Sequence, residues 1–498
     1  MNDSATPAYD ALERACCRMH RLGHLQALAY WDQAVNMPPK GNEARAAAMA
    51  ELAALLHRQR TAPAFGQRIA EAEQEPLSVL QRANLREIRR RWDADTALPE
   101  ALVERRTLAA ARCEHAWRTQ RAANDWDGFA PNFREVVAIA REQAALLAQR
   151  QGVPRYEALV QEYEPGLRCS TIDRIFGDLR RWLPALIQAV VERQRGQSVI
   201  APVGPFPLPA QRALSERVMR LLGFDFDAGR LDVSAHPFCG GTPEDVRLTT
   251  RFAEDDFLGA LMGTAHETGH ARYEQKLPRA WLQQPLGMAR SMAIHESQSL
   301  AFEMQLGAHP GFVALLAPLL AQAFGSQPAF EPSNLQRLLT RVTPGFIRIE
   351  ADEVTYPAHV IVRYEIERAL IEGEIEVDDV PALWDAKMME LLGVDTRGNH
   401  RDGAMQDVHW AEGIFGYFPC YTLGAMYAAQ WFAAMRDGTP DLDARIAAGD
   451  LAPVFEWLEA RIWSQGSRWS TDELAERASG RVLDPAHFRE HLQRRYLG

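Results

Sequence analysis

Apolar residues at helical spacing are the most constraining feature of this 498-residue chain. From Tyr9 to about Arg195 they recur at intervals of three or four positions, which places them on one face of an amphipathic helix. One such run consists of Tyr9, Leu12, Cys16 and Met19, and another of Leu52, Leu55 and Leu56. Short breaks rich in proline and glycine separate the runs. The pattern predicts a mostly α fold.

One segment departs from this spacing, between Leu231 and Phe252. There Val246, Leu248 and Thr250 alternate with polar residues, which is the period of a β-strand. Helical spacing returns after Asp255 and continues toward the C-terminus. We therefore expect a small antiparallel β element near residues 231–252 within a helical protein.

A proline-rich stretch at residues 202–209 marks a possible boundary, since its prolines exclude a regular helix. Apolar helical spacing resumes directly after it, and Phe206 and Leu208 are poorly suited to an exposed tether. We interpret it as a loop within one domain. The expected organisation is a single domain over residues 1–498, with a helical N-terminal part at 1–200 and a second part at 201–498.

The net charge of −11 argues against a nucleic-acid partner, which requires a basic surface. The six cysteines form no CxxC pair, and we interpret them as reduced thiols. The N-terminus lacks the basic and apolar pattern of a secretory signal, and the apolar stretch Phe312–Phe324 is too short to span a bilayer. We expect a cytoplasmic protein without a membrane partner.

The chemistry is concentrated in the segment LGALMGTAHETGHARY. Leu258, Leu261, Met262 and Ala265 mark an apolar helical stripe, and Asp255 or Asp256 suits the helix start. His266 and His270 are four residues apart, so one helix face presents both imidazoles to a single tetrahedral ion. Glu267 is then positioned as general base toward an activated water. The competing interpretation is a pair of surface histidines.

A catalytic zinc requires a third protein ligand. The best candidate by spacing is Glu296, in RSMAIHESQSLAFEMQ, whose apolar pattern predicts a second helix beside the first. His295 and Glu303 are the competitors in the same segment. The pattern HExxHxxGxxH is absent, which favours a glutamate from a later helix over a third nearby histidine.

The HExxH pattern of residues 266–270 is typical of zinc peptidases. If such an enzyme acts at the C-terminus of a peptide, it also requires a cation opposite the terminal carboxylate, ideally the bidentate fork of an arginine. By residue type the candidates are Arg247, Arg251, Arg348 and Arg363.

The chain contains the segments HPF at 236–238, DVRLT at 245–249, HETGH at 266–270, HESQ at 295–298, IRIEADE at 347–353 and GAMQDVHW at 403–410. Together these segments resemble the carboxypeptidase Taq family of zinc metallocarboxypeptidases. The resemblance extends over nearly the whole chain, for example to YWDQAVNMPPKG near Tyr30 and GIFGYFPCYTLG at 413–424.

This resemblance implies a single large helical domain with a long substrate groove, one divalent metal ion, and removal of single C-terminal residues from peptides with broad preference. It also implies a homodimer. By position the metal ligands fall on His266, His270 and Glu296, and the general base falls on Glu267. Zinc is the expected ion, although cobalt or manganese can occupy the same ligands.

The resemblance further assigns Arg348 as the clamp for the terminal carboxylate, with Arg247 and His236 near the end of the groove. His409 and Tyr421 fall near the scissile carbonyl, where a hydroxyl or imidazole can stabilise the oxyanion. Two alternatives stay open: a helical HExxH oligopeptidase or dipeptide-releasing enzyme, and a non-catalytic peptide-binding protein. Analysis of the peptide products would distinguish the first alternative from a carboxypeptidase, and the absence of bound metal would indicate the second.

Overall fold

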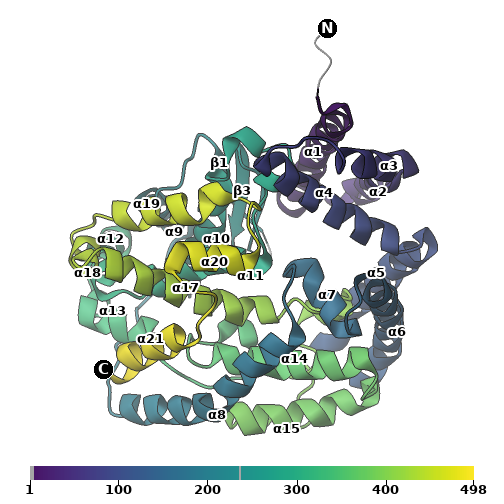
Figure 1. Ribbon diagram of the computed structural model, residues 1–498. Coiled ribbons are helices and arrows are strands. Elements are labelled where there is room, and N and C mark those ends of the chain that lie inside the picture. Colours follow the sequence, from purple (N-terminus) through teal and green to yellow (C-terminus); the bar gives the residue numbers. More distant parts are fainter. Residues whose placement is uncertain (1–4, 235–236) are drawn as a thin grey trace. The chain divides into compact units, whose positions relative to one another are not determined.

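The computed structural model describes residues 5–234 and 237–498, and helices dominate it (Figure 1). This confirms the predicted mostly α fold with a minor β element. Among the described residues no single helix is long and apolar enough to cross a membrane, whereas one bent pair, Pro285–Gly307 with Pro310–Phe324, matches such a span in length and composition.

Contacts divide the chain into two compact units, each made of three chain segments. Unit 1 comprises 1–95, 199–339 and 427–484, and unit 2 comprises 96–198, 340–426 and 485–498. The boundaries of these units therefore differ from the predicted division at residue 200. The prediction that the chain forms a single domain stays a prediction.

Unit 1 holds most of the elements around the HExxH segment. Its helices are α1 (Pro7–Val35), α2 (Asn42–Thr61), α3 (Pro63–Ala72), α4 (Val79–Ala97), α9 (Leu208–Leu221), α10 (Leu258–Gln275), α11 (Met292–Leu300), α12 (Pro310–Phe324), α13 (Pro332–Leu339), α18 (Leu442–Ala447), α19 (Ala452–Arg461) and α20 (Thr471–Ser479). The boundary at residue 95 falls in α4, and that at residue 426 falls in α17 (Pro419–Gly438).

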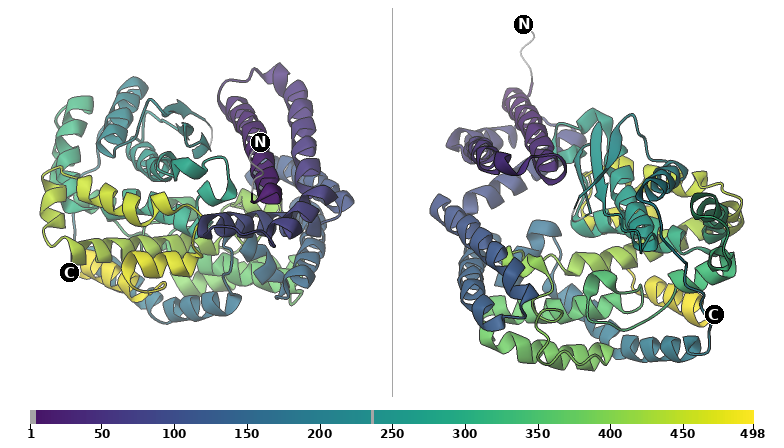
Figure 2. Two further views of the ribbon diagram at one scale, coloured as in Figure 1. Left: turned by 45° about the horizontal axis from the view of Figure 1, so that its top comes forward. Right: turned by 180° about the vertical axis from the view of Figure 1, so that it is seen from behind.

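The first helix confirms its predicted spacing, whereas in α2 only Leu56 of the second predicted run is buried and Leu55 is exposed. Tyr9, Leu12 and Cys16 of α1 are buried against Phe65 and Ile69 of α3. Helices α1 and α2 run side by side as a hairpin (Figure 2). The apolar stripe of α1 therefore becomes the core of this part of unit 1.

The β element is a three-stranded sheet of β1 (Gly229–Val233), β2 (Phe238–Thr242) and β3 (Asp245–Thr250), in the order β1-β3-β2. The expected antiparallel pairing is found between β2 and β3, but β1 pairs with β3 in parallel, so the sheet is mixed. Strand β1 lies beside β3 because Leu231, Val246 and Leu248 join one apolar cluster with residues of the helices. That cluster includes Ala271, so it attaches the sheet to α10.

Unit 2 is helical. It contains α5 (Glu100–Ala122), α6 (Trp126–Gln151), α7 (Arg155–Tyr163), α8 (Cys169–Gln194), α14 (Tyr356–Glu372), α15 (Val380–Leu392), α16 (Val408–Ala411), the start of α17, and α21 (Ala486–Leu497). Helices α14 and α15 lie side by side (Figure 1). Trp410 of α16 stacks on Phe133 of α6, which holds the short helix α16 on the core of this unit.

The same core contains one buried carboxylate that joins three segments. Glu367 of α14 accepts hydrogen bonds from the Tyr156 hydroxyl, the Trp410 indole and the Gly416 backbone, at 2.8, 2.8 and 2.9 Å. Burial raises the pKa of Glu367 to about 7, and the three donors oppose this shift.

Candidate metal centre

Helix α10 begins where the sequence predicted it. The carboxylate of Asp256 accepts hydrogen bonds from the backbone amides of Leu258 and Gly259, at 2.9 and 3.1 Å, which satisfies donors left unpaired at the start of a helix. Leu261 and Ala265 are buried, so one face of the helix packs into the core. His266 and His270 follow on this firmly packed helix.

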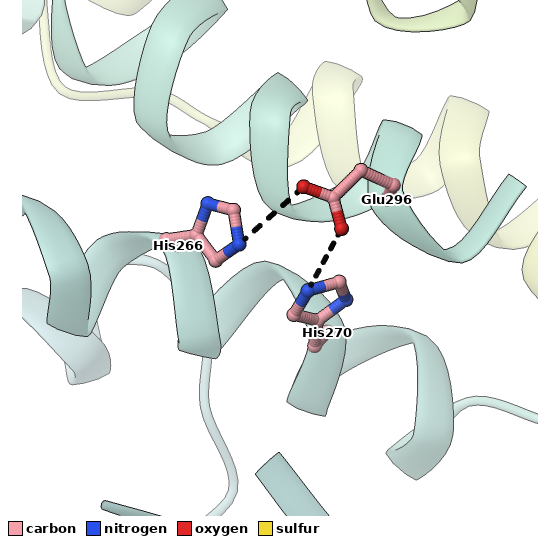
Figure 3. A group of neighbouring side chains, drawn as sticks. All are labelled: His266, His270 and Glu296. Atoms are coloured by element: carbon pink, nitrogen blue, oxygen red, sulfur yellow. Dashed lines mark ion pairs between the residues drawn. The ribbon is translucent and has the colours of Figure 1, made fainter. Parts of the chain in front are cut away.

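His266, His270 and Glu296 come together as one group, with a ligand atom of each within 4.8 Å of those of the others. The Nε2 atom of His266 lies 3.7 Å from one Glu296 oxygen, and Nε2 of His270 lies 3.5 Å from the other. Figure 3 shows the two imidazoles on successive turns of α10, with the Glu296 carboxylate facing both. Among the described residues no other His, Cys, Asp or Glu cluster has this arrangement.

Glycine within the HETGH motif permits this meeting. A Cβ atom added at Gly269 would lie 2.4 Å from the carbonyl oxygen of Gln298 and 2.6 Å from the Cα atom of Ser299. The backbones of α10 and α11 therefore approach more closely than any side chain at this position would allow. Gly269 brings the helix that carries Glu296 within reach of the two histidines.

Helix α11 is also held by hydrogen bonds on its other sides. The Ser291 hydroxyl accepts from the Ile294 amide at 3.3 Å and caps the helix start. The indole of Trp431 donates to Ser297 at 3.1 Å, and that of Trp463 donates to Gln298 at 2.8 Å. These bonds fix the rotation of α11, and so the direction of Glu296.

The second ring nitrogen of each histidine is also engaged. Nδ1 of His266 lies 2.7 Å from a carboxylate oxygen of Glu303. Glu303 belongs to a π-helical segment, η4 (Ala301–Gly307), which continues α11. Because a carboxylate only accepts, Glu303 keeps a proton on Nδ1 of His266, so Nε2 is the nitrogen that faces Glu296 and is available to an ion.

His270 reaches a carboxylate through an intermediate ring. Its Nδ1 lies 2.6 Å from Nδ1 of His295, and Nε2 of His295 lies 2.8 Å from Glu274. Both competitors for the third ligand position, His295 and Glu303, are thus placed beside the two histidines of the motif.

Charges in this cluster favour a bound cation. Burial lowers the pKa of His266, but the hydrogen bond to Glu303 and the charge of Glu296 outweigh burial and raise that pKa to about 10. Burial also raises the pKa of Glu267 to about 7, His266 opposing and Glu296 adding to the shift. His270 has a pKa far below its ordinary value, because of its burial and then the neighbouring His295, and so stays neutral.

The donor set suits a divalent ion. Two imidazole Nε2 atoms and one carboxylate match the three protein ligands of a catalytic zinc site, which leaves a further coordination position for water or substrate. The oriented Nδ1 atoms are what such ligands normally show. The residues present therefore fit the metal that the motif predicts.

A second cluster of predicted residues lies in unit 2, around Arg348. Nε and Nη2 of this arginine donate to Asp407 at 3.0 and 2.8 Å, and Nη1 donates to the Tyr356 hydroxyl at 2.7 Å. Arg363 donates to the other oxygen of Asp407 at 2.6 Å. Two arginines thus share one buried aspartate. Burial alone would raise the pKa of Asp407, but the two guanidinium groups hold it well below its usual range.

His409 and Tyr421 belong to this same cluster. The Tyr421 hydroxyl lies 3.4 Å from Nε2 of His409, and the guanidinium of Arg348 lies 4.9 Å from the centre of the Tyr421 ring. Burial lowers the pKa of His409 to about 4, helped by Arg348 and opposed by Asp407. His409 is therefore neutral near pH 7. The ring of Tyr417 also lies close to that of Tyr421, at 5.2 Å between centres.

The other predicted arginines have different surroundings. Arg247 on β3 of unit 1 forms a bidentate pair with Asp245, at 2.9 Å for both contacts, and its guanidinium lies 4.3 Å from the Trp31 ring centre. Arg251 is exposed just after β3. His236, predicted near Arg247, lies outside the described residues.

Sequence reasoning missed Asp407, Tyr356 and Glu274. Asp407 stands inside the GAMQD segment, whose Gln406 also accepts from the Arg348 backbone amide at 2.7 Å. The adjacent polar residues Gln406 and Asp407 could therefore have indicated a contact with an arginine. For Glu274 the sequence signal was weaker: it follows His270 by four residues and so lies on the same side of α10.

Comparisons with known proteins identify the family of the chain. The model of a family described as carboxypeptidase Taq (M32) metallopeptidase matches residues 11–496. Thermostable carboxypeptidase 1 of Thermus thermophilus is 38% identical over 488 residues, covering 95% of either chain. Carboxypeptidase 1 of Bacillus subtilis is 32% identical over 487 residues, covering 96% of either chain.

Solved structures give the same result. Metallocarboxypeptidase 1 of Trypanosoma cruzi matches with a TM-score of 0.97 and 48% identity, covering 99% of this chain and 100% of that one. A Pyrococcus furiosus carboxypeptidase matches with a TM-score of 0.94 and 30% identity, covering 100% and 99%. The chain therefore belongs to the carboxypeptidase Taq (M32) family of metallopeptidases.

Proposed function

We propose that this protein is a zinc metallocarboxypeptidase that releases single C-terminal amino acids from peptides with broad preference. The observation that carries the proposal is the meeting of His266, His270 and Glu296, with Glu267 on the same helix. The names of the relatives, all carboxypeptidases, support removal from the C-terminus.

The ligand residues are His266, His270 and Glu296, and a divalent ion held there would polarise the scissile carbonyl and acidify a water molecule. Glu267 accepts the proton of the attacking water and passes it to the leaving amine.

Arg348 is proposed to bind the terminal carboxylate. Three of its five N–H groups are used by Asp407 and Tyr356, and two remain. Since Arg348 and Arg363 share one aspartate, their cluster carries an uncompensated positive charge, which suits a carboxylate.

His409 and Tyr421 are proposed to stabilise the oxyanion, as neutral hydrogen-bond donors. Tyr417 is an alternative to Tyr421 by chemistry. Arg247 and His236 are proposed to line the end of the substrate groove. We further propose that the enzyme is a cytoplasmic homodimer, and that cobalt or manganese can replace zinc.

Mass spectrometry of peptide products tests the function. An unblocked peptide and its C-terminally amidated form are incubated with zinc-loaded protein, and with protein treated with a chelator. We expect stepwise loss of single C-terminal residues from the free peptide only, abolished by chelation. Internal cuts or released dipeptides would instead support an oligopeptidase, and a lack of any cleavage would support a binding protein.

A further inference from the structure

The two histidines of the motif are oriented in different ways. His266 contacts the Glu303 carboxylate directly, whereas His270 contacts Glu274 only through the ring of His295. The contrast concerns residues that are not themselves metal ligands, and its meaning rests on the metal site of the proposed function.

The proton positions along the second path follow from one fixed end. Glu274 only accepts, so Nε2 of His295 carries a proton and donates it across 2.8 Å. In the tautomer with this single proton, Nδ1 of His295 is bare and accepts across the 2.6 Å contact with His270. His270 therefore holds its proton on Nδ1 and presents the Nε2 lone pair toward Glu296, 3.5 Å away.

Packing holds the intermediate ring in place. The His295 ring lies 4.7 Å from that of His270 and 5.3 Å from that of Tyr273, measured between centres. The Tyr273 hydroxyl in turn accepts from the Arg290 backbone amide at 3.1 Å. His295 is also the residue before Glu296 on α11, so the chain that positions the third ligand also positions this ring.

We propose that His295 and Glu274 are positioning residues for the metal, and that Glu274 acts on it only through His295. Together they set the tautomer and ring orientation of His270 and increase its basicity as a ligand. Glu274 thereby raises metal affinity without contacting either the ion or a ligand.

A thermodynamic cycle on zinc affinity tests the proposal. The variants are His295→Phe, which keeps a ring for packing but removes both nitrogens, Glu274→Ala, and the double variant. Zinc affinity is measured on the full chain by competition with a chromophoric chelator. The matched control is Glu459→Ala. Glu459 lies on α19, is also a partly exposed glutamate, and pairs with Lys276 at the end of α10.

We expect Glu274→Ala to weaken zinc binding by about tenfold and His295→Phe by about 10- to 100-fold, as is typical for residues that orient metal ligands. In the His295→Phe background, Glu274→Ala should have no further effect. The control should bind zinc like the wild type. The melting temperature of the metal-free proteins should change little, which separates a positioning role from a folding role.

A second readout is the visible spectrum of the cobalt-loaded protein, which responds to ligand geometry. Its bands should shift in His295→Phe and in Glu274→Ala alike. Unchanged affinity and spectrum in both single variants would overturn the proposal, as would effects of the two substitutions that simply add. These readouts need no substrate, so a wild type that binds zinc but cleaves no peptide would refute the proposed function alone.

Discussion

Two clusters in this chain place opposite charges in similarly buried surroundings. Around the HETGH motif of unit 1, four glutamates (Glu267, Glu274, Glu296 and Glu303) lie next to three histidines. In unit 2, Arg348 and Arg363 share the single carboxylate of Asp407. One cluster has an excess of anionic groups and the other an excess of cationic groups.

The comparison teaches what each site is built to receive. Buried charges of one sign are costly unless an opposite charge accompanies them. The pKa directions agree, since the pKa of Glu267 is raised by burial and that of Asp407 is lowered because its two arginines outweigh burial. The first cluster thus suits a cation, and the second an anion such as a peptide carboxylate.

The largest effect is expected from Glu267→Gln, which tests whether one carboxylate of the anionic cluster does chemistry instead of binding metal. Loss of the general base should lower turnover by about 10³-fold or more, while zinc content stays unchanged. Steady-state kinetics and metal analysis measure the two. A variant retaining a tenth of the activity would show that Glu267 is not the base.

The cationic cluster is tested by Arg348→Lys, which keeps the charge and removes the planar fork. We expect kcat/KM for unblocked peptides to fall by about 10²-fold, and the preference for free over amidated peptides to shrink with it. Arg368→Lys is the control, because Arg368 pairs with Asp173 in a partly exposed position of the same unit. An unchanged preference for the free carboxylate would refute the clamp.

The closeness of α10 and α11 is tested by Gly269→Ala. The added Cβ would meet the backbone of α11, so we expect a loss of about 1–3 kcal/mol in unfolding free energy, together with weaker zinc binding. Gly263→Ala, on the same helix, is the matched control because its Cβ would meet nothing within 4 Å. Denaturant unfolding compares the two, and equal stability of both variants would contradict the close approach.

Acid sensitivity is expected from the buried Glu353 of unit 2, which contacts His491, Arg495 and Tyr496. Burial would raise the pKa of Glu353, but His491 and Arg495 hold it at about 2. A carboxylate whose pKa is lowered on folding stabilises the fold above its ordinary pKa of about 4.3, and this contribution disappears as pH falls toward 2.

Glu353→Gln should therefore flatten the decline in unfolding free energy between about pH 5 and pH 2, by about 2 kcal/mol. Urea unfolding at several pH values measures this. Asp395→Asn is the control, since Asp395 and its partner Arg397 are both exposed, and an exposed ion pair contributes little to the unfolding free energy. A decline in Glu353→Gln as steep as in wild type would contradict the assignment.

The smallest effect is expected from Glu303→Gln. Because Gln offers a neutral acceptor in place of a carboxylate, the His266 tautomer is kept with less support, and zinc affinity should fall by about tenfold. Chelator competition measures it. A change below about twofold would mean that the direct carboxylate contact contributes less than the longer path through His295.

Local sequence patterns predicted much of this molecule. The spacing at Tyr9, Leu12 and Cys16 identified a buried helix face, and four residues between His266 and His270 sufficed to place both on one side of α10. Period-two alternation at Val246 and Leu248 identified a strand. These patterns are reliable because they depend on backbone geometry alone.

Pairings between distant segments were harder to predict. Alternation says which residues of β3 face the core but not which strand lies beside it, so the parallel β1–β3 pair was not foreseen. The contact between Arg348 and Asp407 joins residues 59 positions apart, and no periodicity encodes it. Spacing made Glu296 the best candidate for the third ligand, and the resemblance supported it. Spacing could not rule out His295 and Glu303, which also lie near the motif histidines.

The interleaved segments of unit 1 also govern when the metal centre is completed during synthesis. Its proposed ligands lie in the middle segment of the unit, but Trp431 and Trp463, which hold α11, belong to the last segment. Gln298 and Trp463 are 165 residues apart, so at about 5–20 residues per second the ribosome needs roughly 10 to 30 seconds to supply the final support. A nascent chain thus exposes its metal-binding helices before they are fixed, and metal loading is expected to follow release of the finished protein.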